Sequence, residues 1–120
     1  VSYEKLSPKQ LKVFFESAYV VALPFLLIPS EIPLTYFEVL SCGTPIITFK
    51  NGGTTDYVKN ATVVISDRTP QTLSSGLELI CKNNQYRDYL AKQARVLMKN
   101  HPSWKEFAKQ WIKAIDNLAV

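Results

Sequence analysis

The chain has 120 residues, of which 47% are apolar and 20% are charged, and its formal net charge is +4. This composition is typical of an ordinary globular domain, so it excludes disorder and a fibrous repeat, and the length suits a single domain over residues 1–120. The longest apolar run, at 19–29, contains Pro24 and is too short to span a bilayer. Because the sequence carries no export leader, we expect a cytoplasmic protein.

The first third of the chain predicts helices and a strand in alternation. Ser7 and Gln10 have the spacing of a capping box, which begins a helix. A β-branched apolar run at 19–24 predicts a buried central strand. A helix is then expected over 33–42, and Gly43 is placed to end it in the left-handed conformation.

Two more strands are expected at 45–49 and 61–65. A turn at Asn51-Gly52-Gly53 follows the first of these strands. One helical turn, capped by Thr54 or Thr55, is expected between that turn and the second strand. Strands that alternate with helices favour a parallel sheet, so the predicted fold class is α/β.

Beyond residue 66 the sequence predicts helices only. Thr69 and Ser103 are the expected caps of the first and the last of them. The last helix gathers its apolar side chains on one side, which we interpret as a core face, and places lysines on another. Contact with a membrane surface is the alternative interpretation of this helix. The apolar set is Trp104, Phe107, Ala108, Trp111, Ile112, Ile115 and Leu118, and the lysines are Lys105, Lys109 and Lys113.

Four reactive or charged positions are interpreted as structural. Cys42 and Cys81 lack the spacing of metal ligands, and we expect two buried free thiols. His101 is the single histidine and is expected at the surface, because no catalytic triad or metal cluster can be assembled around it. Asp56 is interpreted as an acidic residue at a helix start.

Residues 30–43 form the strongest candidate for a binding site. They lie between a predicted strand and the following helix, where ligands collect in open α/β sheets. Free N–H groups at the start of that helix, those of Leu34 and Thr35, would bind an anion such as a diphosphate. Glu38, one turn further on, has no basic partner in the helix and could accept hydrogen bonds from a diol. Together these features describe a nucleotide sugar.

Four segments of the chain carry a resemblance to a known family. They read Ala22-Leu23-Pro24, Pro33-Leu34-Thr35-Tyr36-Phe37-Glu38, Cys42-Gly43-Thr44-Pro45-Ile46-Ile47 and Gly52-Gly53-Thr54-Thr55-Asp56. Through them, residues 11–60 resemble the donor-binding half of the carboxy-terminal domain of GT-B glycosyltransferases, specifically the retaining enzymes of family 4. The resemblance implies a partial Rossmann-like domain of three layers, with a short parallel sheet and a helical carboxy-terminal end.

The resemblance also implies roles for individual residues. In that family two glutamates with seven residues between them bracket the turn and the helix; the second binds the donor ribose and the first lies beside the transferred sugar. Glu38 matches the second. Glu31 lies one residue too close to Glu38, and Ser30 has the family spacing, so these two are the candidates for the catalytic, sugar-side position. By the same resemblance, Leu34 and Thr35 bind the diphosphate. Gly52 and Gly53 permit close backbone approach to the ligand.

The implied donor substrate is a nucleotide-diphospho-sugar that gives up a hexose, with no further cofactor. The resemblance places further strands and an amino-terminal acceptor domain before this segment, so we expect the latter part of such an enzyme, inactive without that domain or a partner chain. Open strand edges and the aromatic face at 104–118 predict self-association as a homodimer. The competing hypothesis is a non-catalytic nucleotide-binding or protein-interaction module.

Nucleic-acid binding is the third hypothesis. Residues 82–113 hold eight basic side chains against two acidic ones, which could attract an anionic polymer. No groove of aromatic and basic side chains supports this hypothesis, and we expect no nucleic-acid partner.

Overall fold

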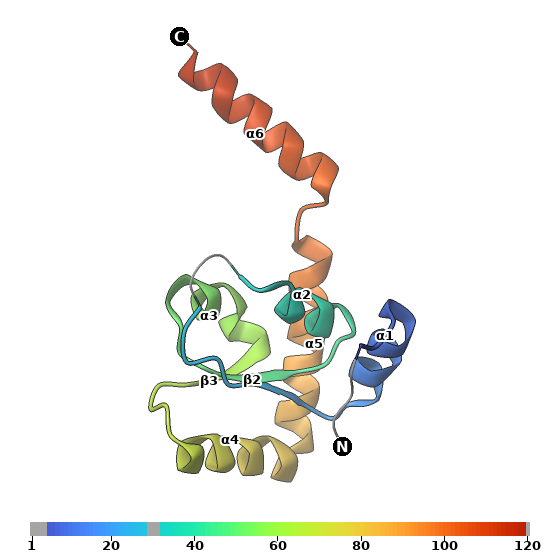
Figure 1. Cartoon of the computed structure of the whole chain (residues 1–120), viewed down its shortest axis with the longest axis vertical. Coiled ribbons are helices and arrows are strands. Elements are labelled where there is room, and N and C mark those ends of the chain that lie inside the picture. The colour runs from blue at the N-terminus through green and yellow to red at the C-terminus, as the bar shows by residue number, and fades with distance from the viewer. Residues whose placement is uncertain (1–4, 29–31, 120) are drawn as a thin grey trace.

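A computed structural model describes residues 5–28 and 32–119 of the chain. It has an α/β fold with three parallel strands, which confirms the predicted fold class (Figure 1). In chain order the elements are α1 (Pro8–Ser17), β1 (Val21–Leu23), α2 (Leu34–Ser41), β2 (Ile46–Phe49), α3 (Gly52–Val58), the 3₁₀ turn η1 (Lys59–Ala61), β3 (Thr62–Ile65), α4 (Pro70–Lys82), α5 (Asn84–Asn100) and α6 (Trp104–Leu118).

The strands are arranged in the order β1-β2-β3, with Ile46 opposite Val21 on one side and Thr62 on the other. Every residue of β2 is buried, as expected for a strand between two neighbours. The prediction of a buried central strand at 19–24 is wrong. Among the described strands β1 pairs with β2 alone, and Ala22 at its centre is exposed.

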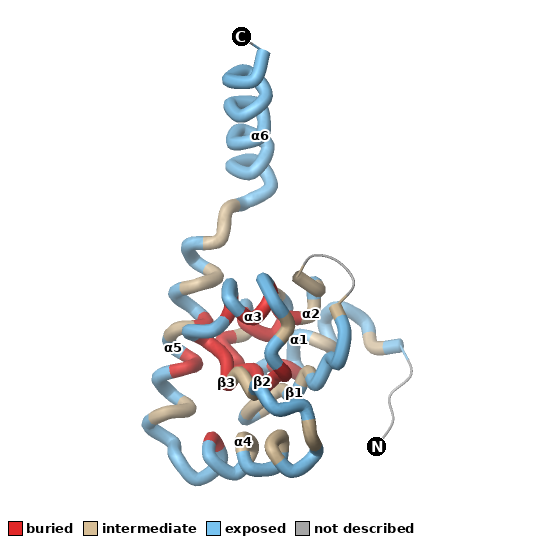
Figure 2. The backbone as a smooth tube through the Cα atoms, turned by 90° about the vertical axis from the view of Figure 1, so that its left-hand side faces the viewer, coloured by how far each residue is buried: buried red, intermediate tan, exposed pale blue. Residues whose placement is uncertain are grey.

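Helices cover both faces of the sheet and give three layers. On one face Phe15 of α1, Leu40 of α2 and Val58 of α3 pack with Ile46. On the other face Ile80 of α4 packs with buried residues of β2 and β3. Figure 1 shows α2 and α3 above the sheet and α4 below it, while α5 extends past both faces. The buried positions therefore gather around β2 and β3 (Figure 2).

Local sequence signals set most helix ends as predicted. The capping boxes of α1 and α6 are both formed, at Ser7 and at Ser103. Thr69 caps α4 in the same way. Gly43 follows α2 with φ +70°, and a Cβ atom there would lie 2.7 Å from Nε of Arg95. The positive φ favours glycine at this position, whereas the Arg95 guanidinium is the end of a flexible side chain that can move aside.

The segment after β2 differs from the prediction. Gly52 and Gly53 form the first turn of α3 instead of a separate turn, so the helix begins three or four residues before the position that a Thr54 or Thr55 cap would give. The reason lies in Thr55, whose hydroxyl accepts a hydrogen bond from the Asn51 N–H and donates one to the Gly52 carbonyl. These bonds close the first turn. Asp56 consequently lies in the middle of α3 and is not the predicted acid at a helix start.

The carboxy-terminal helix is the main departure from the predicted packing. No residue of α6 is buried, and Trp104 is 84% exposed, so the expected core face is wrong for the described chain. The helix projects from the body and gives the molecule a longest dimension of 55 Å (Figures 1 and 2). Its periodicity identified the apolar side correctly, but periodicity does not say which surface covers that side.

The two cysteines are free thiols, but they are not both buried as predicted. Cys42 is half-buried, whereas Cys81 is exposed because it lies on the outer side of α4. Within residues 5–28 and 32–119, no helix combines the length and the hydropathy needed to cross a membrane.

Candidate functional site

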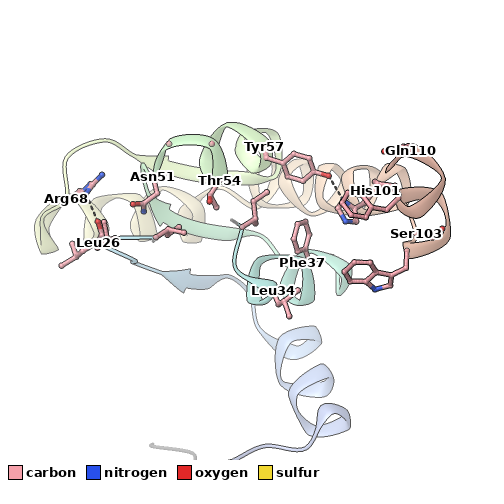
Figure 3. A pocket seen from close by; sticks show the side chains of 18 residues that line it. Leu26, Leu34, Phe37, Asn51, Thr54, Tyr57, Arg68, His101, Ser103 and Gln110 are labelled. Carbon is pink, nitrogen blue, oxygen red and sulfur yellow. Dashed lines mark hydrogen bonds between the residues drawn. The ribbon is translucent and has the colours of Figure 1, made fainter. Parts of the chain in front are cut away.

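A cavity of about 1040 Å³ opens at the carboxyl edge of the sheet (Figure 3). Each strand contributes to it through the residues that follow: Leu26 after β1, Asn51 after β2 and Arg68 after β3. The opposite wall is formed by Phe37 of α2, by the turn between α5 and α6, and by Trp104 at the start of α6. Ligands of open parallel sheets bind at this edge, so the cavity is the candidate site.

Two side chains tie the strand ends together along the cavity. Asn51 Nδ2 donates to the Phe25 carbonyl at 2.7 Å. Arg68 donates through Nη1 to the Leu26 carbonyl at 2.7 Å and through Nη2 to the Lys50 carbonyl at 2.8 Å (Figure 3). Consecutive carbonyls of the loop after β1 are therefore held by residues that follow β2 and β3. No pattern in the sequence indicated this role for Arg68, because its partners are distant along the chain.

A buried hydrogen-bond chain lies at the same end of the sheet. The Thr48 hydroxyl donates to the Leu23 carbonyl at 2.7 Å, and the Tyr36 hydroxyl lies 2.7 Å from the Thr48 oxygen. Since Thr48 has one proton to give, Tyr36 is the donor to Thr48. Burial raises the pKa of Tyr36 above its ordinary value, and the hydrogen bond to Thr48 acts in the opposite direction. This chain joins β1, β2 and α2.

Aromatic residues close the far end of the cavity. The His101 ring lies on Phe37 with 4.7 Å between ring centroids, and Tyr57 meets it at 2.7 Å from its hydroxyl to Nδ1. His101 is half-buried and lines the cavity, so the prediction of an ordinary surface histidine is wrong. A lone histidine in a turn gives no sequence signal of such a contact, because Phe37 and Tyr57 belong to two distant helices.

Two of the helices that begin at the cavity, α2 and α3, differ from the other helices at their first turn. Side chains cap the starts of α1, α4, α5 and α6. In the described chain no side chain caps α2, which follows Pro33, or α3, which follows Asn51. The first N–H groups of α2, those of Leu34 and Thr35, are consequently left for a ligand or water.

The residues predicted for the site are only partly brought together. Leu34, Gly52 and Gly53 line the cavity, whereas Thr35 and Glu38 do not. Glu38 is exposed, and it follows Leu34 by four residues, which places both on the same side of α2. The two candidates for the catalytic position, Ser30 and Glu31, lie outside the described residues.

Other reactive groups give no second site. Burial raises the pKa of the Cys42 thiol, and the Glu16 carboxylate raises it further, so this thiol is not an activated nucleophile. Across the described part of the chain, no three His, Cys, Asp or Glu side chains are grouped so that they could hold a metal ion.

Comparison with known proteins identifies the family. The model of the glycosyl transferases group 1 family matches residues 3–97, which is most of the chain. The chain belongs to this glycosyltransferase family. The match confirms the resemblance seen in the sequence. It includes α2, α3 and the cavity-lining residues that follow the three strands. His101 and α6 lie beyond the matched residues.

A relative of this group 1 glycosyltransferase chain occurs in Methanocaldococcus jannaschii, where it is an uncharacterized glycosyltransferase. The two are 24% identical over 104 residues. The match covers 85% of this chain and 26% of the relative, so the chain spans about a quarter of the length of the curated relative that it matches.

Proposed function

We propose that the chain forms the donor-binding part of a glycosyltransferase that transfers a hexose from a nucleotide-diphospho-sugar to an acceptor. One observation carries the proposal. In a chain of this family, the cavity at the carboxyl edge of the sheet adjoins the start of α2, where no side chain caps the first N–H groups within the described residues. Such a helix start favours negative charge, as a diphosphate supplies.

The donor would extend along α2 from the cavity outwards. The N–H groups of Leu34 and Thr35 bind the diphosphate at the first turn. Glu38, on the same side as Leu34 and exposed, binds the two ribose hydroxyls outside the cavity. A carboxylate can accept two such hydrogen bonds at once.

The sugar would then enter the cavity, where Gly52 and Gly53 allow the backbone of α3 to approach it. Ser30 or Glu31 would lie at the sugar edge. In this chemistry the leaving diphosphate is stabilised by positioned donors, which lowers the barrier without a protein nucleophile. An amino-terminal acceptor domain or a partner chain would supply the acceptor side of the cleft, so we expect the 120 residues alone to transfer no sugar.

Nucleotide titration tests the proposal. Uridine, guanosine and adenosine diphosphates are added separately while the amide resonances are followed by NMR, and shifts are expected at Leu34, Thr35 and Glu38. The Glu38→Ala variant should weaken binding by about 1–3 kcal/mol, the range for hydrogen bonds to a charged group. Glu78→Ala is the matched control, since Glu78 is an exposed glutamate of α4, on the other face of the sheet. The proposal fails if none of the three nucleotides perturbs the start of α2.

A further inference from the structure

Most polar side chains that line the cavity already have partners in the protein. The Asn51 amide and the Arg68 guanidinium donate to backbone carbonyls. Tyr57 and Nδ1 of His101 bond each other, and Ser103 caps α6. Gln110 has no such bond among the described residues, but it is exposed on α6 and can be satisfied by water.

Thr54 differs from Gln110 because its side chain is buried. It lines the cavity and is only 5% exposed, yet its hydroxyl has no hydrogen-bond partner within the described chain. The neighbouring Thr55 is equally buried, but its hydroxyl bonds Asn51 and Gly52. Figure 3 shows Thr54 extending from α3 towards the strand beneath it. Its oxygen is not fully enclosed, in contrast to the unpaired oxygen of Thr62, so a ligand in the cavity can reach it and take the place of water there.

We propose that the Thr54 hydroxyl binds a ring hydroxyl of the transferred sugar and helps to select that sugar. This inference rests on the proposed function. Leu34 and Thr54 line the same cavity from α2 and α3, so a donor whose diphosphate lies at Leu34 directs its sugar towards Thr54. A sugar hydroxyl can donate to and accept from a threonine hydroxyl, and the C–H faces of the ring suit the apolar part of the lining. That lining includes Leu26, Ile28, Phe37 and Phe107.

Thr62 provides a matched control for the experiment. Its hydroxyl oxygen is fully enclosed and has no partner in the described chain, and it lies at the start of β3, where it does not line the cavity. Valine has nearly the shape of threonine and lacks the hydroxyl. Thr54→Val and Thr62→Val therefore remove the same group from two buried places, only one of which a ligand can reach.

The experiment compares nucleotides with and without the sugar. Uridine, guanosine and adenosine diphosphates and their glucose and mannose esters are titrated into the chain and its variants, and each dissociation constant is measured by NMR. Thr54→Val is expected to weaken binding of the nucleotide sugar about two- to tenfold, as loss of one hydrogen bond does. Binding of the free nucleotide should be unchanged. Thr54→Ser keeps the hydroxyl and should retain affinity, while Thr62→Val should affect neither ligand.

The outcomes separate this inference from the proposed function. If the wild-type chain binds no nucleotide and no nucleotide sugar, both are overturned. If the wild-type chain binds them, but Thr54→Val weakens the binding of both ligands equally or of neither ligand, only the role of Thr54 is overturned. The amide spectrum of each variant shows whether it is folded, and Thr54→Ala replaces Thr54→Val if the valine variant is not.

Discussion

The Tyr57 hydroxyl lies 2.7 Å from Nδ1 of His101, although the two residues are 44 positions apart in the chain. His101 also lies on Phe37 and directly precedes Pro102, after which α6 begins. One small contact therefore joins α3, α2 and the turn that sets the direction of α6. Because His101 and Pro102 line the cavity, the same contact shapes its far wall.

Replacing Tyr57 by phenylalanine should lower the free energy of unfolding by about 0.5–1.5 kcal/mol, the net value of one hydrogen bond, since the ring is kept. Urea unfolding measures the loss. Tyr89→Phe is the control, because Tyr89 is an exposed tyrosine of α5 without a hydrogen bond among the described residues. Equal stability of the two variants would show that the Tyr57–His101 bond contributes nothing.

The Tyr36–Thr48 pair should respond unequally to its two single substitutions. Tyr36→Phe removes a donor and leaves Thr48 bonded to Leu23, for a loss of about 0.5–1.5 kcal/mol. Thr48→Val leaves the buried Tyr36 hydroxyl without a partner, which costs about 1–3 kcal/mol. The double variant should lose less than the sum of the two, because the orphaned group is then gone. Urea denaturation of all four proteins completes the cycle, and strict additivity would contradict the prediction.

Stability at high pH should depend on Tyr36. Its pKa is raised above 10.0 in the folded state, chiefly by burial, so above pH 10 the unfolded chain releases this proton while the folded chain retains it. The unfolded state then binds fewer protons, and stability falls as pH rises from 10 towards the folded pKa. The wild type should therefore lose stability more steeply than Tyr36→Phe in that range. Parallel slopes in urea melts at successive pH values would refute this.

Arg68 should hold the loop after β1 without supporting the rest of the fold. In Arg68→Gln, hydrogen exchange of the Phe25 amide, which donates to the Leu23 carbonyl, should quicken about fivefold, corresponding to roughly 1 kcal/mol for exposed bonds to a charged donor. Arg87→Gln is a close control: Arg87 donates to the Tyr19 carbonyl, before β1 begins, at the opposite end of the strand. That variant should leave exchange of the Phe25 amide unchanged. Equal exchange rates in the two variants would show that Arg68 does not hold this loop.

The exposed apolar face of α6 should cause self-association, most simply as a two-fold dimer. Sedimentation over a concentration series measures it. Trp111→Glu places a charge on the apolar face and should favour the monomer, whereas Lys109→Glu changes the polar side of the same helix and should not. A monomer at every concentration would contradict the expectation, and equal effects of the two variants would assign association to another surface.

Local chemistry explains what could be predicted from the sequence. A capping serine such as Ser103 acts on its own first turn, and Gly43 adopts a conformation that few other residues tolerate, so the helix ends are encoded nearby. The apolar runs at 45–49 and 61–65 likewise predicted β2 and β3 from local sequence. The placement of Leu34 and Gly52 at one cavity followed from the rule that parallel strands end at a common edge.

The remaining features depend on neighbours that are distant along the chain. Whether β1 is central or at an edge is decided by the strands beside it, and its composition is compatible with both. Arg68 and His101 acquire their roles from carbonyls and rings on other elements. The free hydroxyl of Thr54 became distinct from that of Thr55 only when the first turn of α3 was known.

The projection of α6 determines what intrinsic fluorescence can report. Both tryptophans of the chain, Trp104 and Trp111, lie on this helix, with exposed fractions of 84% and 58%. Their emission should already be that of indole in water, so unfolding of the sheet should change it little. Because an indole emits at shorter wavelength when it leaves water, a blue shift would instead mark the moment at which another surface covers α6.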